Sequence, residues 1–566
     1  MHLASPGLGA RRVHRTRLAP RFNSDLMEGD EETPGTPESD PPKPNPPREP
    51  AGASSRVAFG ILASRVFGVA RQVLQAHFLG VSHAADAFTA AFKIPNILQN
   101  MFGEGALSAS FIPVYARLLA KNDEEEAGHV AGAVFGLLSL TVAVIVLIGV
   151  VAAPILIPLI AAGFEPDTKR LTIQYTRILF PGAGIFVISA WCLGILNSHR
   201  KFLLSYSAPV LWNIAMIAAL LWFGPKHATV DDLAAKLAWA SVVGAAMQFL
   251  VQVPSTLRLV KRLRINVETK SVHVQSVMRN FAPVFVSRGV VQISAYIDQW
   301  IATFLPSGIV ATLGYAQTIY VLPVSLFGMA VSAAQLPEMS SALGHEDEVA
   351  AFLRTKLAGG LRQIAYFVIP SAMAFLAFGD VIAGLLLQHG RFSARDTHYA
   401  WGILAGSAVG LLASTLGRLY SSTYYALHDT KTPLRFAIVR VVLTTVLGFV
   451  FAIALPRAFG IDSHWGAAGL TASAGIAGWV EFLLLRSRLN QRIGETGLPV
   501  RLSVQLWLCA VVGGASGWGM RYLAMGQNRY VSGVLVLAAF GSVYLGATFM
   551  IGVPEARSAF ARLKRR

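Results

Sequence analysis

The sequence has few charged residues and almost no cysteine. Only 14% of its 566 residues are charged, whereas a soluble domain carries about 25%, so the chain lacks the surface that contact with water requires. Cys192 and Cys509 lie in separate apolar runs, which excludes a disulfide framework and a cysteine-based metal site. No HExxH, GxSxG or P-loop motif occurs. We therefore expect no cofactor, no metal and no enzymatic activity.

Apolar residues fill the rest of the chain. They make up 54% of the sequence, and the mean hydropathy is +0.52. From about residue 57 onward the apolar runs are each long enough to cross a hydrocarbon core of roughly 30 Å. The sequence predicts an all-α polytopic membrane protein with about 14 transmembrane helices. The predicted spans are 57–80, 85–118, 127–152, 171–196, 205–223, 232–256, 278–304, 308–333, 357–379, 397–425, 434–455, 463–486, 503–524 and 530–552.

The first 55 residues have a different composition. Residues 28–56 are rich in Pro, Glu, Asp and Ser, a composition that cannot bury a core. Residues 1–21 are basic but are not followed by an apolar stretch, so they do not resemble a signal peptide. We expect residues 1–55 to form a disordered cytoplasmic tail.

The net charge of +17 comes from short clusters of Lys and Arg between the apolar runs. This placement is typical of topology signals and does not indicate a nucleic-acid partner. Roughly twice as many cations lie in the loops on the N-terminal side as on the other, which predicts that both termini are cytoplasmic. Residues 556–566 would then be a basic cytoplasmic tail.

The chain also contains a weak internal repeat with an offset of about 225 residues. Ser64-Arg65 recurs as Ser287-Arg288, and Lys93-Ile94-Pro95 recurs as Val321-Leu322-Pro323. The repeat predicts two pseudo-symmetric six-helix lobes around a central cavity, at 56–260 and 275–490, with two further helices at 500–555. Chance similarity between apolar helices is the alternative.

Two arginines lie within the first predicted span. Ionisable side chains cost about 2.5–3.5 kcal/mol each at the centre of a bilayer, so they must face water or a partner. Arg65 is about eight residues, or roughly 12 Å, from the start of the span. Arg71 follows six residues later. A guanidinium suits phosphate or carboxylate, so both predict an anion site. Arg71 could instead extend to the membrane surface.

The second span carries a polar stripe. Asp86, Lys93, Asn100 and Glu104 follow one another at i, i+7, i+14 and i+18, which places them on one helix face. Asn96 flanks this face, and Gln99 lies off it. Such a stripe predicts a water-filled lumen. Two alternatives stay open: Asp86 could cap its own helix, and Lys93 and Glu104 could pair with other buried charges.

The seventh span adds Arg288, Gln292 and Gln299 on one face, with Asp298 beside them. Arg288 could bind substrate or could pair with Asp298. Together the first, second and seventh spans supply a set of cations and carboxylates at membrane depth. A buried set of this kind is typical of a pyrophosphate or carboxylate binder.

At this point the residues resemble a known family. The segment SRVFGVARQVLQAHFLG with ADAFTAAFKIPNILQNMFGEGALSASFIPVYA (64–116), LNSHRKFLLSYSAPVLWN (196–213) and YYALHDTKTP (424–433) resemble blocks of the MurJ/MviN family of lipid II flippases. The resemblance implies the fold of the multidrug/oligosaccharidyl-lipid/polysaccharide exporter superfamily, a cationic cavity and a lipid-tail groove at helices 13 and 14. It also implies flipping of undecaprenyl-pyrophosphate-linked peptidoglycan precursor to the outer leaflet of the bacterial inner membrane by alternating access, for cell-wall synthesis.

The resemblance matches Arg65, Arg71 and Asp86 to the family's cavity residues. Gln72, Gln99 and Thr318 depart from it, because well-studied members have an acidic residue at the first of these positions and arginine at the other two. The full set of predicted substrate-binding residues is Arg65, Arg71, Asp86, Lys93, Asn96, Gln99, Asn100, Glu104, Arg288, Gln292 and Asp298.

The expected partners are lipid II and membrane lipids. The departures from the family pattern leave one alternative, an exporter of another polyprenyl-linked oligosaccharide in the same superfamily. The energy source is open between the membrane potential, a sodium ion and a proton, so coupling to a monovalent cation is one of the options.

Overall fold

The computed structural model describes residues 53–102, 104–226, 229–341 and 345–557. For residues 53–59, 61, 94–95, 104–105 and 286–295 it describes the backbone alone. The predicted tails at 1–55 and 556–566 fall almost entirely outside the described residues.

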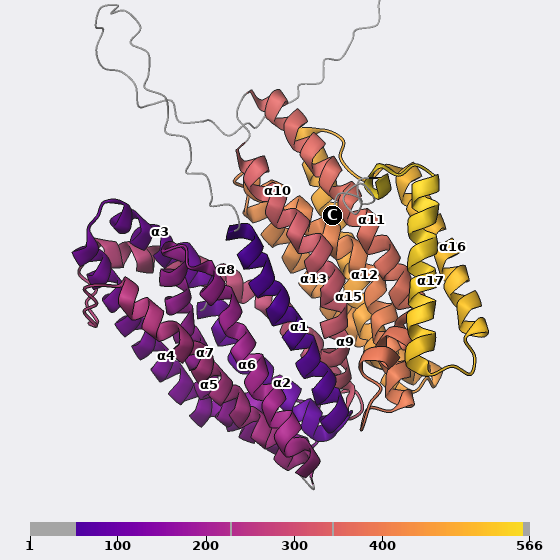
Figure 1. Cartoon of the computed structure of the whole chain (residues 1–566), viewed down its shortest axis with the longest axis horizontal. Helices are drawn as coiled ribbons and strands as arrows, with labels where there is room; N and C mark the ends of the chain where they lie inside the picture. Colours follow the sequence, from indigo (N-terminus) through magenta and orange to yellow (C-terminus); the bar gives the residue numbers. More distant parts are fainter. Residues whose placement is uncertain (1–52, 103, 227–228, 342–344, 558–566) are drawn as a thin grey trace, which may run out of the picture. The chain divides into compact units, whose positions relative to one another are not determined.

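The described residues form helices and no strand (Figure 1). The elements are α1 (Ala53–Leu79), α2 (His83–Phe102), α3 (Glu104–Ala120), α4 (Glu124–Ile160), α5 (Pro166–Ser198), α6 (Phe202–Phe223), η1 (Gly224–Lys226), α7 (Val230–Leu259), α8 (Val272–Ala302), α9 (Ile309–Pro323), η2 (Val324–Met329), α10 (Ala330–Ser340), α11 (Glu346–Leu386), α12 (Ala394–Ala426), α13 (Lys431–Phe449), η3 (Val450–Ala454), α14 (Leu455–Phe459), η4 (Ser463–Trp465), α15 (Gly466–Ile493), α16 (Val500–Leu523) and α17 (Arg529–Met550). The all-α prediction is confirmed.

Each predicted span coincides with one helix or with consecutive helices. In the part of the chain that was described, 11 helices are long and apolar enough to cross a membrane. The total of about 14 stays a prediction. The remaining segments, α1, α2 with α3, and α8, are the ones that carry all the predicted substrate-binding residues.

Some helices are longer than predicted. α4 begins at Glu124, where the Asp123 carboxylate accepts a hydrogen bond from the Glu126 backbone N–H at 3.0 Å, and it continues to Ile160. α11 spans Glu346–Leu386, well beyond 357–379. The apolar runs mark only the part of a helix at membrane depth, whereas capping residues and acidic first turns extend it further.

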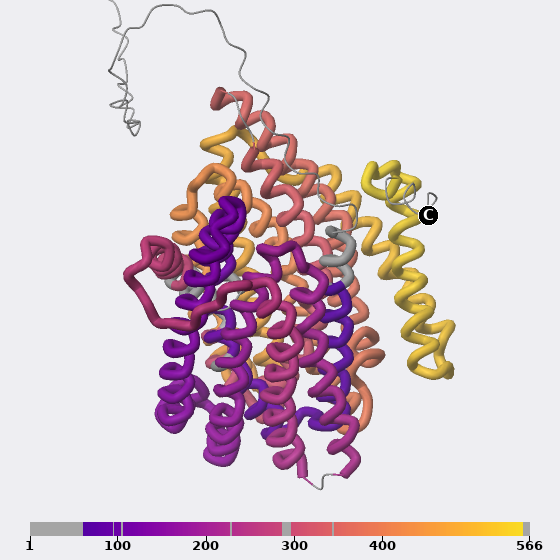
Figure 2. Tube along the Cα trace, turned by 60° about the vertical axis from the view of Figure 1, so that its left-hand side comes forward, coloured from indigo at the N-terminus to yellow at the C-terminus, as the bar shows by residue number. Residues whose placement is uncertain are grey.

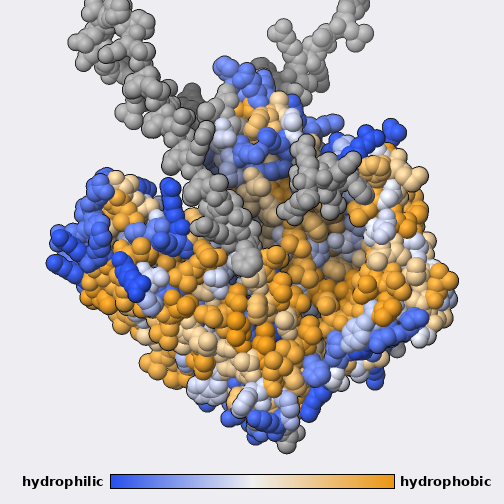
Figure 3. Space-filling model, viewed as in Figure 1, coloured by the Kyte–Doolittle hydropathy of each residue, from blue (hydrophilic) through white to orange (hydrophobic). Residues whose placement is uncertain are grey.

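The outward faces of these helices are apolar. On α4, Ile155 is 76% exposed and Leu159 is 73% exposed. In the visible face of Figure 3, hydrophobic side chains cover the middle and hydrophilic ones gather at the two ends. A lipid bilayer is the solvent that stabilises such a surface.

The same packing pattern occurs twice along the chain. We call α1–α7 the first bundle and α8–α15 the second bundle. In the first bundle the packed pairs include α1 with α6, α2 with α5, α4 with α5, α5 with α7 and α6 with α7. The corresponding pairs in the second bundle are α8 with α13, α9 with α12, α11 with α12, α12 with α15 and α13 with α15. This recurrence supports the predicted duplication, while the lobe boundaries stay a prediction because residues 53–557 belong to one compact unit.

α16 and α17 stand outside both bundles. They pack against each other and against α11, and Figure 2 shows this hairpin in yellow at one side of the other helices. An ion pair of 2.9 Å between Arg521 of α16 and Asp380 of α11 fixes the contact.

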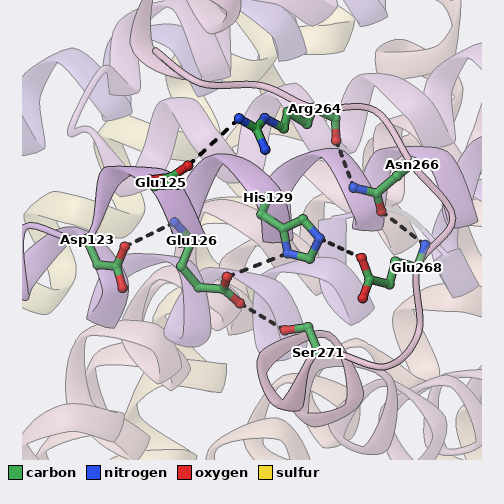
Figure 4. A network of polar contacts seen from close by, with 8 residues as sticks. All are labelled: Asp123, Glu125, Glu126, His129, Arg264, Asn266, Glu268 and Ser271. Atoms are coloured by element: carbon green, nitrogen blue, oxygen red, sulfur yellow. Dashed lines mark hydrogen bonds and ion pairs between the residues drawn. The ribbon is translucent and has the colours of Figure 1, made fainter.

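The linker between α7 and α8 is held against α4 by polar contacts (Figure 4). His129 contacts the Glu268 carboxylate at 3.1 Å, and the Ser271 hydroxyl donates to the Glu126 carboxylate at 2.9 Å. The network joins the end of the first bundle to the start of α8. It lies at the end of the molecule where α1 and α4 begin, which we call the proximal end.

The YYALHDTKTP block forms the proximal turn between α12 and α13. The Asp429 carboxylate accepts hydrogen bonds from the Thr432 backbone N–H at 3.0 Å and from the Thr432 hydroxyl at 2.8 Å, and it lies 3.5 Å from the Arg492 guanidinium. Burial raises the pKa of Asp429, but these hydrogen bonds and the arginine charge outweigh it and hold the pKa below its usual value. The block therefore caps α13 and joins it to α15.

The two bundles are joined by hydrogen bonds at the opposite end, where α1 ends, which we call the distal end. The Tyr315 hydroxyl donates to the Gly80 carbonyl at 3.1 Å, and the Arg391 backbone N–H donates to the His77 carbonyl at 2.9 Å. The Gly163 backbone N–H donates to the Thr303 hydroxyl at 3.1 Å. The bundles are thus tied together around the ends of α1, α4 and α8.

Gly80 is the residue on which this distal contact depends most directly. Its φ is +60°, and a Cβ there would lie 2.8 Å from the Arg391 backbone oxygen. We expect Gly80→Ala to lower stability by about 2 kcal/mol, because alanine is strained in the left-handed region and would displace Arg391. The midpoint of thermal unfolding in detergent measures the effect. Gly519→Ala, at an exposed helical glycine with nothing within 4 Å of its Cβ position, is the control and should not lose stability. An equal midpoint for both variants would contradict the prediction.

Candidate functional site

A cavity of about 460 Å³ lies between the two bundles. Its described lining comes from α1 and α2 of the first bundle and from α8, α9, α12, α13 and α15 of the second. The charged side chains among these residues are Arg71, Lys93, Arg440 and Asp298. Cations therefore outnumber carboxylates in the described lining, and the cavity favours an anion.

A larger cavity, of about 720 Å³, lies at the distal end. Loop residues near Phe164, Pro306 and Asp462 line much of it. We take the smaller cavity as the candidate site, because it lies among the helices and holds the cations at membrane depth, where a charge must have a partner or a function.

Arg71 is a predicted site residue that lines the cavity and is held by three side chains. Its Nε donates to the Asn213 side-chain oxygen at 3.0 Å, and its Nη1 donates to the Gln75 side-chain oxygen at 2.9 Å. The guanidinium lies 4.8 Å from the centre of the Trp212 ring. These contacts fix its plane while leaving other N–H groups for a ligand. The alternative that Arg71 extends to the membrane surface does not fit this geometry.

Lys93 and Asp298 line the same cavity, as does Asn96. Lys93 comes from α2 and Asp298 from α8, so the two charges approach each other from different bundles. The Asp298 carboxylate lies within electrostatic reach of both Lys93 and Arg440. Its Oδ1 is buried and has no hydrogen-bond partner among the described residues.

Asp86, in the first turn of α2, is held by backbone groups of the second bundle. It is 2% exposed, and it accepts hydrogen bonds from the backbone N–H groups of Gly308 at 2.5 Å and Ala311 at 2.7 Å. It therefore caps α9 across the bundle interface rather than α2, whose first turn is capped by Ser82. This geometry gives Asp86 a structural role at the distal end, where it also lines the larger cavity, and its assignment to the substrate site stays a prediction.

The other predicted residues are placed less directly. Arg65 is half-buried on α1, about 9 Å along the helix from Arg71 toward the proximal end, and it pairs with no described residue. Gln99 and Asn100 are half-buried on α2 but are not among the described residues of the cavity lining. The side chains of Glu104, Arg288 and Gln292 lie outside the described residues.

Sequence reasoning missed Arg440. It lies on α13 and forms an ion pair of 3.1 Å with Glu481 of α15. The signal was present, since an arginine and a glutamate occur inside two predicted apolar spans, at 434–455 and 463–486. The two were not connected because nothing in the sequence shows that these spans pack together.

Comparisons with family models, with curated proteins and with solved structures all match lipid II flippases. The family model for lipid II flippase MurJ matches residues 75–541. The lipid II flippase MurJ of Burkholderia cenocepacia is 31% identical over 508 residues, which cover 87% of this chain and 95% of the relative. The probable lipid II flippase MurJ of Rhizobium tropici is 30% identical over 530 residues, which cover 90% of this chain and 96% of the relative.

Solved structures share the fold. A lipid II flippase MurJ in an inward closed conformation matches with a TM-score of 0.73 at 24% identity, covering 90% of this chain and 99% of that one. An inward-facing multidrug transporter of the MATE family matches with a TM-score of 0.60 at 17% identity. The match covers 78% of this chain and 98% of that one. The cavity, the helix order and these matches together lead to one conclusion: the chain belongs to the lipid II flippase MurJ family.

Proposed function

We propose that this chain is a lipid II flippase, which moves the undecaprenyl-pyrophosphate-linked peptidoglycan precursor from the inner to the outer leaflet of the bacterial inner membrane. It acts as a transporter and makes no covalent change in its substrate. The observation that carries the proposal is the cavity between the bundles, where Arg71, Lys93 and Arg440 place cations at membrane depth. Guanidinium groups bind phosphate through paired, charge-assisted hydrogen bonds.

Alternating access is the proposed mechanism. The proximal end, with its clusters of Lys and Arg, faces the cytoplasm, and so do both termini. Asp86, Tyr315 and Arg391 join the bundles at the distal end, so the described conformation is the one closed to the outside. Breaking these contacts would open the cavity outward. The charges in the cavity allow the membrane potential, a sodium ion or a proton to drive the change.

Complementation tests the proposed function. A bacterial strain depleted of its own lipid II flippase should grow when it expresses this chain, because the chain restores delivery of the cell-wall precursor. Growth and cell shape are measured together with the amount of protein in the membrane fraction. Lysis of the depleted strain, with the chain present in the membrane at normal level, would contradict the proposal. Rescue limited to a strain that lacks an exporter for another polyprenyl-linked oligosaccharide would favour that alternative.

A further inference from the structure

Arg440 is an ionisable residue inside the membrane helix α13. Folding of this helix does not by itself call for a charged side chain at that position. Arg440 lies about 13 Å from the start of α13, at a depth where a charge costs about 2.5–3.5 kcal/mol. Its Nη1 donates to the Glu481 carboxylate of α15 at 3.1 Å. The ion pair offsets part of this cost, but replacing a buried pair by apolar side chains is often neutral or stabilising.

The two side chains of this ion pair differ in exposure. The Arg440 side chain is 38% exposed, whereas that of Glu481 is 17% exposed. Arg440 is among the residues that line the cavity, and Glu481 is not. A guanidinium has five N–H donors, and the contact to Glu481 uses one N–H group, on Nη1.

The charge of the cavity indicates which kind of ligand Arg440 meets. Among the described residues that line the cavity, three are cations, Arg71, Lys93 and Arg440, and one is a carboxylate, Asp298. The excess is positive, so an anion is favoured over a cation. Arg71 comes from the first bundle and Arg440 from the second, so the cavity presents cations of both bundles to an anion.

We infer that Arg440 is the second bundle's binding residue for the diphosphate of the lipid-linked substrate, and that Glu481 is a positioning residue that holds its guanidinium. The inference rests on the proposed function and assigns a residue to its site. It also links binding to movement, because an anion shared by the two bundles draws them together around the cavity.

Binding to the purified chain in lipid nanodiscs tests the inference. The probes are lipid II and undecaprenyl diphosphate, which has the same diphosphate but no sugar or peptide. We expect Arg440→Gln to weaken binding of both probes by about 10-fold to 100-fold, the usual value of hydrogen bonds to a charged group. Arg435→Gln removes the same charge from an exposed position on the same helix, outside the described cavity lining, and should bind both probes like the wild type.

Glu481→Gln tests the positioning role. Used alone it should weaken binding less than Arg440→Gln, and combined with Arg440→Gln it should have no additional effect, because Glu481 acts only through Arg440. The double variant leaves no unpaired buried charge, so its binding can be measured even if a single variant unfolds. Wild-type affinity of Arg440→Gln or of the double variant for both probes would overturn the inference and leave the proposed function standing. Weaker binding of lipid II alone would overturn the diphosphate assignment. A wild-type chain that binds neither probe would instead contradict the proposed function.

Discussion

Arg71→Ala is expected to abolish complementation of a flippase-depleted strain while the protein still inserts into the membrane. The substitution removes a guanidinium held by Asn213, Gln75 and Trp212 at the wall of the cavity. Losing several charge-assisted hydrogen bonds to phosphate, each contributing about 1.5–3 kcal/mol, would weaken binding by more than 100-fold. Growth of the depleted strain and transport in proteoliposomes measure the result.

Two further substitutions sharpen this experiment. Arg170→Ala, at an exposed arginine near the distal end, is the matched control and should support growth. Arg65→Ala is also expected to abolish complementation, as both arginines are predicted to bind substrate. Full growth with Arg71→Ala would remove this residue from the site. Loss of growth with Arg71→Ala but not with Arg65→Ala would confine the site to the described cavity.

Asp86→Ala is expected to cause the largest loss of stability. The carboxylate accepts hydrogen bonds from the Gly308 and Ala311 backbone N–H groups across the bundle interface. Alanine would leave both donors buried without a partner, at about 1–3 kcal/mol each, so the total is on the order of 4 kcal/mol. The midpoint of thermal unfolding in detergent should fall, and transport should be lost because the distal end no longer closes.

The control is Asp167→Ala, which removes an exposed carboxylate from the first turn of α5 at the same distal end. It should change the unfolding midpoint only slightly. Asp86→Asn keeps one acceptor oxygen. Its unfolding midpoint should lie between those of Asp86→Ala and Asp167→Ala. If Asp86→Ala unfolds at the wild-type temperature but fails to bind lipid II, the carboxylate binds substrate and the capping role is wrong.

Much of the fold could be predicted from local properties of the chain. An apolar run of suitable length predicts a helix wherever it lies in the sequence, so each predicted span coincides with helical structure. The segments between Val324 and Met329 and between Val450 and Ala454 are π-helical within such runs. The apolar pattern does not reveal this, because it is insensitive to the hydrogen-bond register of the backbone.

The site was predicted less completely than the fold. Arg71, Lys93 and Asp298 were identified because a charge in an apolar run is costly and therefore needs a function or a partner. The pattern cannot say which of the two applies. Asp86 was expected near substrate, but its partners are backbone N–H groups of α9, more than 200 residues away in the chain. Arg440 was not predicted, because its partner Glu481 belongs to a different span and the sequence does not show that the two spans pack together.

The sequence by itself determined that the chain is a helical membrane protein, where most of its spans lie, which helices carry charge at membrane depth and which family it resembles. The first three of these properties follow from composition, periodicity and residue spacing, which are local, and the family resemblance comes from the match of sequence blocks. Only the tertiary structure decided which charges share the cavity and which ones hold the bundles together. Electrostatic and hydrogen-bond energies depend on distances between atoms, and those distances exist only once the two bundles have packed.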